Sequence, residues 1–162
     1  MFVPEYTMLV MKMNHCIKGK EDALIDQIYD EILALDLNKQ EKKDIALRGF
    51  RYYLDKGDAE RTSLFHDKVN EIETNESILK EVNGKYKVIV EKDDDYLQTL
   101  LDEMIEMEDI ERYQNEYLVS IIYRRQGEEE KADRYLELSK QHKQRMDEIL
   151  ERMKKEGKKK KQ

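Results

Sequence analysis

The side chains that could bind a metal ion or transfer a proton are three histidines, one cysteine and several acidic clusters. His15 and Cys16 are adjacent, but His66 and His142 lie far from them in the sequence. No further ligand follows His15 and Cys16 at the spacing of a metal site. Each histidine is therefore predicted to be a surface or packing residue.

The acidic clusters also lack the patterns that metal chemistry needs. In "DEMIEMEDIE", Glu103, Glu106 and Glu111 lie near one another, without the Glu-x-x-His pattern of di-iron helical bundles. The run "EKDDD" lacks the glycine and terminal glutamate of a calcium loop, and there is no phosphate-binding glycine loop or nucleophile elbow. We predict solvated helix faces, no metal, no cofactor and no enzymatic activity.

Composition favours long helices as the elements that carry these residues. Charged residues make up 41% of the chain and hydrophobic residues 39%, with one proline and six glycines. A sheet protein would have more turn residues and more Val, Ile and Thr. The composition therefore predicts an all-α protein, with a single helical domain over residues 1–153.

Charge is distributed unevenly along the chain. The net charge is −7, although Lys154 to Gln162 contain six lysines and one glutamate. Residues 154–162 are predicted to be a basic, frayed tail; contact of this tail with an anionic membrane or with RNA is an open alternative. The acidic remainder argues against duplex nucleic acid as a partner, since binding to phosphates requires a basic face.

Cysteine content and the N-terminal sequence predict a cytoplasmic protein. Cys16 is the only cysteine, so no disulfide can form within the chain. The apolar run "MFVPEYTMLVMKM" has no basic n-region and is too short to span a bilayer. No membrane insertion is expected.

Breaks between helix-like segments recur at a fixed interval. Gly57 and Gly127 are 70 residues apart, and Lys92 lies halfway between them, next to three aspartates. Gly49 and Gly84 are also 35 residues apart, whereas Gly19 precedes Gly57 by 38. A period of this length predicts stacked structural repeats.

Helix-capping residues define the expected helices. Tyr6–Lys18 and Glu21–Leu35 form a first pair, and Asn38 with Glu41 gives the capping-box pattern of a third helix that reaches Lys56. An eighth helix is expected to begin near Glu128. The intervening helices are predicted to start after Asp58, after Asn75, after one of Asp93 to Asp95, and after Asp109.

The segment "ILKEVNGKYKVIVE" has two interpretations. Asn83-Gly84 between runs of Val and Ile is typical of a β-hairpin. An isolated hairpin is only marginally stable, and no other segment supplies a sheet. We therefore predict a helix that tolerates Gly84, in the 35-residue register.

The segment from Glu116 to Gln144 resembles a tetratricopeptide repeat, a helix-turn-helix unit of about 34 residues. Ser120 and Ala132 match the small positions at which the two helices approach closely, and Gly127 matches the turn. Val119 and Tyr123 match the large apolar and aromatic positions, and Leu136 and Ser139 follow. Glu116 and Gln144 depart from the tryptophan and proline that are common in the family.

This resemblance implies stacked antiparallel hairpins in a right-handed superhelix, about four hairpins with a C-terminal helical extension. Such arrays bind partners on a concave face formed by the first helix of each hairpin. Transferring the register residue by residue assigns Leu47, Arg51, Leu54, Tyr86, Ile89, Gln114, Tyr117, Ile121 and Arg124 to partner binding, together with Tyr6, Leu9, Met13 and Val82. Burial of these residues in a core, under the C-terminal helix, is an open alternative.

The predicted function is that of a scaffold or adaptor that binds an amphipathic or extended apolar segment of a protein or peptide. Arg51 and Arg124 are expected to hold carboxylates of that segment. Three alternatives remain open from the sequence: a regulatory peptide sensor, a protein similar to secretion chaperones, and a structural domain that self-associates into a homo-oligomer.

Overall fold

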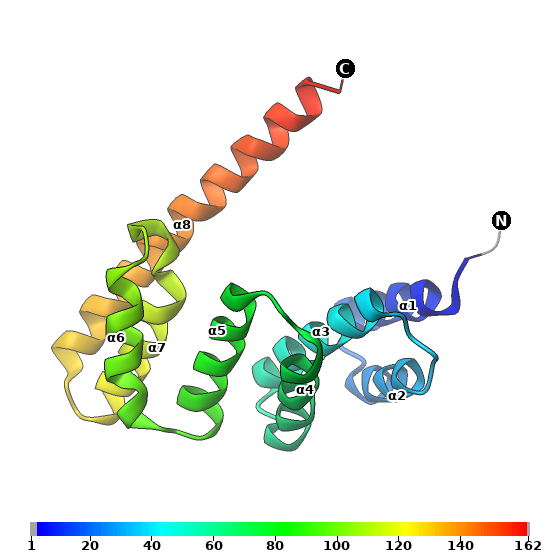
Figure 1. Ribbon diagram of the computed structural model, residues 1–162, viewed down its shortest axis with the longest axis horizontal. Coiled ribbons are helices and arrows are strands. Elements are labelled where there is room, and N and C mark those ends of the chain that lie inside the picture. The colour runs from blue at the N-terminus through cyan, green and yellow to red at the C-terminus, as the bar shows by residue number, and fades with distance from the viewer. Residues whose placement is uncertain (1–2, 162) are drawn as a thin grey trace. The chain divides into compact units, whose positions relative to one another are not determined.

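Most of the described part of the chain is helical. A computed structural model describes residues 3–161 and contains no strand among them (Figure 1). The all-α prediction is confirmed, and the segment 78–91 is helical rather than a hairpin. The α-helices are α1 (Glu5–Gly19), α2 (Asp22–Leu33), α3 (Lys39–Lys56), α4 (Ala59–Ile72), α5 (Glu76–Lys85), α6 (Leu97–Ile105), α7 (Tyr113–Arg125) and α8 (Glu129–Lys159).

Three shorter helical turns join these helices. A π-helical turn, η1 (Tyr86–Val90), continues α5, and two 3₁₀ turns, η2 (Asp94–Tyr96) and η3 (Asp109–Glu111), precede α6 and α7. Whereas the sequence predicts one domain over residues 1–153, internal contacts group the chain into unit 1 (Met1–Leu79) and unit 2 (Lys80–Gln162). In unit 1, α1 packs on α2 and α3 on α4; in unit 2, α7 packs on both α6 and α8.

Left-handed residues follow α1, α3, η1 and α7 at nearly constant spacing. Gly57, Lys92 and Gly127 have φ angles of 73°, 55° and 78° and lie 35 residues apart, which confirms the three predicted breaks. At the first break the left-handed residue is Lys20 (φ 56°), because Gly19 is still part of α1. Glycine adopts this conformation without the steric cost that a lysine incurs.

Backbone hydrogen bonds show that three of these turns are the same motif. The N–H after the left-handed residue donates to the carbonyl five positions back, the pattern of a Schellman motif. At Lys92 the equivalent hydrogen bond spans six positions, from Asp93 N to Lys87 O (3.0 Å), because the π-helical turn η1 contains one more residue per turn than an α-helix. The three regular cases are Glu21 N to Cys16 O (3.0 Å), Asp58 N to Tyr53 O (3.1 Å) and Glu128 N to Tyr123 O (2.9 Å).

Most predicted helix caps are confirmed. Asn38 and Glu41 form the reciprocal capping box at the start of α3. The prediction that Asp109 caps the seventh helix is wrong, because Asp109 lies within η3 and α7 begins at Tyr113. Asp58 accepts from Arg61 N at the start of α4, and Asn75 accepts from Ser77 N and Ile78 N at the start of α5. Asp93 accepts from Asp95 N and caps η2, the 3₁₀ turn that leads into α6, whereas α6 itself begins without a side-chain cap.

Aromatic rings fill the core of unit 1. The ring of Phe65 on α4 lies 5.3 Å from Tyr29 and stacks on Tyr53 at 5.6 Å between centroids. Gly49 permits this approach of α3 and α4, because a Cβ at that position would lie 2.3 Å from the Phe65 ring. The small residue is therefore required by packing rather than by backbone conformation.

Aliphatic side chains from the π-turn η1 and from the two helices α6 and α7 form the core of unit 2. Tyr123 packs against this core and contacts the ring of Tyr135 on α8, with centroids 5.7 Å apart. Ser120 (4% exposed) and Ala132 (0%) are buried between α7 and α8. The buried members of the cluster are Val88, Leu100, Met104, Leu118, Val119 and Ile122.

Helix α8 continues well beyond the part that packs on α7. Its last buried residue is Ser139, and residues 150–161 are all exposed. The segment 154–159, predicted to fray, is the end of this helix in the structure, which extends past α6 and α7 (Figure 1).

Candidate binding grooves on α7 and α3

A groove of about 380 Å³ lies on the exposed side of α7, within unit 2. Three residues predicted for partner binding, Tyr117, Ile121 and Arg124, line it together. We call it the α7 groove, and its lining residues are Tyr117, Ser120, Ile121, Arg124, Arg125 and Leu136.

Helical periodicity explains why these residues share one face. Tyr117, Ile121 and Arg124 follow one another at spacings of four and three, whereas Leu118 and Ile122 point into the core of unit 2. Tyr117 is 44% exposed, a large value for an aromatic side chain on a packed helix. Ile121 is half-buried against the core, so it forms the floor of the groove.

Two arginines at the end of the groove are held by acidic residues of this chain. Arg124 donates to Glu129 and to Asp133 on α8, both at 2.7 Å. Arg125 donates through Nε to Asp94 at 2.8 Å and through Nη1 to the carbonyl of Val88 at 2.6 Å. Arg124, which was expected to hold a partner's carboxylate, is thus already paired with two carboxylates.

A buried ion-pair partner lies beside the groove between α7 and α8. Glu116 is 3% exposed, and both of its carboxylate oxygens lie 2.9 Å from Nδ1 of His142. Burial raises the pKa of Glu116, while the hydrogen bond from His142 opposes that shift. The pair ties α8 to the helix that carries Tyr117.

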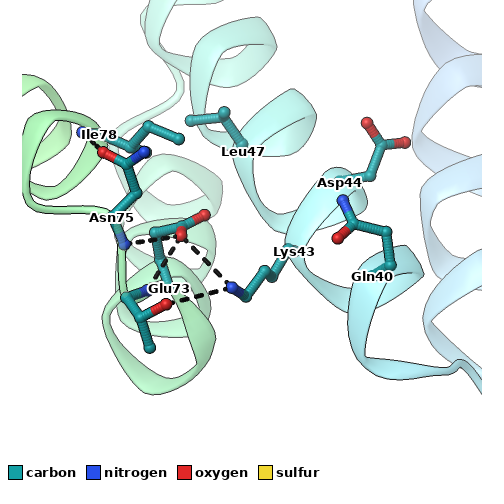
Figure 2. A pocket seen from close by; sticks show the side chains of 8 residues that line it. Gln40, Lys43, Asp44, Leu47, Glu73, Asn75 and Ile78 are labelled. Atoms are coloured by element: carbon teal, nitrogen blue, oxygen red, sulfur yellow. Dashed lines mark hydrogen bonds and ion pairs between the residues drawn. The ribbon is translucent and has the colours of Figure 1, made fainter.

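A second groove, of about 530 Å³, lies in unit 1 between α3 and the segment that joins α4 to α5 (Figure 2). We call it the α3 groove. Leu47, a predicted binding residue, and Ile78 supply its apolar surface and point toward one another in Figure 2. The lining residues are Gln40, Lys43, Asp44, Leu47, Glu73, Thr74, Asn75 and Ile78.

Glu73 fixes one wall of the α3 groove. Its Oε1 accepts from the backbone N–H groups of Asn75 at 3.0 Å and Thr74 at 2.9 Å, and lies 3.6 Å from Nζ of Lys43. These N–H groups, the Asn75 bond first, hold the pKa of Glu73 below its usual range. The carboxylate is therefore ionised at neutral pH, and its Oε1 already contacts two N–H donors and a lysine, which suits a structural wall better than a proton-transferring group.

The remaining predicted residues lie outside both grooves. Arg51 is exposed and Leu54 half-buried on α3; Tyr86 and Ile89 are half-buried on η1, where Ile89 packs against the core of unit 2. Gln114 is half-buried at the start of α7, and its Oε1 is buried without a hydrogen-bond partner within the described part of the chain.

Sequence reasoning also placed buried residues on the open face and missed several groove residues. Met13 (1% exposed) and Val82 (0%) are core residues. Gln40, Lys43 and Asp44 were missed, although they precede Leu47 on the same helical face at spacings of three and four. Leu136 has no such signal, because it reaches the α7 groove from the neighbouring helix.

No cluster of metal-binding side chains exists within residues 3–161. None of the helices in that range is long and apolar enough to cross a membrane. A scan against protein-family models, a search of curated proteins and a search of solved structures each find no match.

Proposed function

We propose that this chain is a tetratricopeptide-like helical repeat protein that binds an extended apolar segment of a protein or peptide in the α7 groove. The recurrence of a left-handed helix-ending residue at Gly57, Lys92 and Gly127, each 35 residues after the last, supports the repeat assignment. Close packing of α7 on α8 at Ser120 and Ala132 supports it further.

The observation that carries the proposed binding site is the exposure of Tyr117 over an apolar floor. A tyrosine that is 44% exposed beside Ile121 and Leu136 offers a rigid aromatic surface whose burial by a ligand is favourable. Tyrosine is among the residues that most often dominate binding energy at protein interfaces.

The charges at the end of the groove define the preferred ligand. Arg124 and Arg125 carry two positive charges against the three negative charges of Glu129, Asp133 and Asp94, so this end of the groove is net acidic. A ligand carboxylate at Arg124 would have to displace one of these partners. We therefore propose a ligand with an apolar side chain over Tyr117 and Ile121, followed by a neutral or basic residue.

The test is selection of binding peptides from a random peptide library against the full chain, followed by titration of the selected peptides against variants. Tyr117→Ala should weaken binding about tenfold or more, as expected for an interface residue that dominates affinity. Ile105→Ala is the matched control, because Ile105 on α6 is 73% exposed and outside the groove.

Two outcomes would reject the proposal. One is a set of selected peptides whose affinity is the same for wild type and Tyr117→Ala. The other is a stable dimer in solution that Tyr117→Ala dissociates, because the groove would then be a self-association surface.

A further inference from the structure

The distal part of α8 carries an apolar stripe that is partly open to solvent. Tyr135, Ser139 and His142 face α7, and the same alternation of four and three residues continues to Met146, Ile149 and Met153. Leu150 (48% exposed) and Met153 (61%) are exposed, and Met146 and Ile149 are partly exposed. We call residues 143–161 the distal α8 segment.

Basic residues border this stripe on both sides. At 100° per residue, Lys143 and Lys154 flank one edge of the stripe, and Arg145 and Arg152 flank the other. Two of the four acidic residues, Glu148 and Glu151, fall on the opposite face. Asp147 lies about 20° from Lys154, and Glu156 lies between Ile149 and Arg145, so each flank is basic in sum but carries one acidic residue. The distal α8 segment contains nine basic and four acidic residues, whereas the whole chain has a net charge of −7.

A second copy of this chain does not suit the stripe. Stable interfaces bury roughly 800 Å² on each partner, and four aliphatic side chains fall well short of that area. A second distal α8 segment would also bring its own lysine and arginine side chains against Arg145 and Arg152, which repel them. For the acidic remainder of a second copy, the small area of the stripe is the argument against a stable dimer. The flanking charges require an acidic occupant.

We propose that the distal α8 segment lies flat on an anionic lipid bilayer, as a peripheral attachment that does not cross it. The stripe would enter the boundary between headgroups and acyl chains, while the flanking lysine and arginine side chains extend to the lipid phosphates.

The terminal lysines favour a bilayer over an acidic helix of a partner protein. Lys155 and Lys158 to Lys161 are spread around the helix, so a single partner helix would contact only some of them. Near a charged bilayer, each lysine within the Debye length of about 8 Å adds attraction whichever way it points. Apolar contact and a polybasic cluster together provide the two signals that stable attachment requires.

The acidic remainder of the chain limits the contact to this segment. Outside residues 143–161 the chain is strongly acidic, so an anionic surface repels it. The bilayer would therefore hold the protein by the end of α8 alone, and the attachment would weaken as salt screens the lysines.

The experiment is vesicle flotation with the full chain. Vesicles of equal parts phosphatidylserine and phosphatidylcholine should carry the protein, and vesicles of phosphatidylcholine alone should not. Raising the salt concentration should release it. The variant Ile149→Glu with Met153→Glu should lose binding, whereas Ile105→Glu, a matched change at an exposed site on α6, should retain it.

A second variant tests the charges without altering the apolar stripe. Arg145→Gln with Arg152→Gln should reduce partitioning about fivefold per charge. Helicity measured by circular dichroism checks that α8 is intact in every variant.

Three results would overturn the inference. The first is no binding to the phosphatidylserine vesicles. The second is equal binding by wild type and Ile149→Glu with Met153→Glu, since the lysines alone would then account for it. The third is specific occupation of the stripe by an acidic protein or by a second copy, with vesicles unable to compete.

Discussion

Nδ1 of His142 on α8 lies 2.9 Å from both carboxylate oxygens of Glu116 on α7. This contact joins two helices through a carboxylate that is almost completely buried. Removing His142 would leave the carboxyl group of Glu116 buried without its partner, which is costly when that group is charged. The effect on stability therefore depends on the protonation state of Glu116.

Glu116 gives unit 2 a stability term that depends on pH. Burial raises the pKa of Glu116 above its ordinary value of 4.5; His142 and Arg112 oppose the shift, and Asp109 adds to it. Between 4.5 and the raised pKa, the folded protein retains a proton that the unfolded chain has lost. This contribution to the free energy of unfolding is therefore complete below pH 4.5 and is lost as the pH rises through the raised pKa.

Urea unfolding of wild type and Glu116→Gln across this range measures the term. Relative to Glu116→Gln, wild type should lose stability as the pH rises. Glu151→Gln, an exposed change on the same helix, should run parallel to wild type. If the free energy of unfolding of wild type and of Glu116→Gln changed in parallel with pH, Glu116 would not be the source of the pH dependence.

Gly49 should tolerate no larger residue, since α4 approaches it too closely. Gly49→Ala would place a Cβ 2.3 Å from the ring of Phe65 and should lower the free energy of unfolding by about 1–3 kcal/mol. Gly157→Ala is the control: nothing lies within 4 Å of its Cβ position on α8, so no loss is expected there. Equal effects of the two changes in thermal or urea unfolding would refute the packing argument.

Replacing Lys92 by glycine and replacing Gly127 by alanine should change the free energy of unfolding in opposite directions. A left-handed residue with a Cβ is disfavoured by roughly 1–2 kcal/mol, which exceeds the entropic advantage of about 0.4–1 kcal/mol that a side chain gives by restricting the unfolded chain. Lys92→Gly should therefore raise the free energy of unfolding by roughly 0.5–1 kcal/mol, and Gly127→Ala should lower it by a similar amount. Equilibrium unfolding checks both signs, and a destabilised Lys92→Gly would show that Lys92 is not strained.

The parts of the fold that follow from the sequence are those with local causes. The capping box of Asn38 and Glu41 needs only two residues three positions apart, and its prediction is confirmed. The break at Lys92 follows from the spacing of Gly57 and Gly127.

The errors have tertiary causes. The π-helical turn η1 was not predicted. Within it, the carbonyl of Val88 accepts a hydrogen bond from Arg125, which is distant in the sequence, so the local sequence does not indicate this contact. Asp109 has the composition of a helix cap, but η3 occupies that position and delays α7 to Tyr113.

In the candidate site, too, the features with local causes were predicted and those with tertiary causes were not. Spacing on α7 correctly groups Tyr117, Ile121 and Arg124, since one helix defines the face. Spacing cannot indicate which neighbouring helix covers a face, so Met13 and Val82 were placed on the open side although they are buried. For the same reason, the two acidic partners of Arg124 were not anticipated.

One uninterrupted helix, α8, joins His142, which contacts the buried Glu116, to the exposed tip of the helix at Lys159. At 1.5 Å per residue, the intervening stretch is a rod of about 25 Å. A partner that binds the tip would therefore also constrain the orientation of α7, because a force on the tip is transmitted to the packing of α8 on α7, which includes the Glu116–His142 contact. The geometry makes α8 a lever arm, in which a force at the far end is resisted by the whole packing of α8 on α7, from the Tyr123–Tyr135 contact to the Glu116–His142 pair.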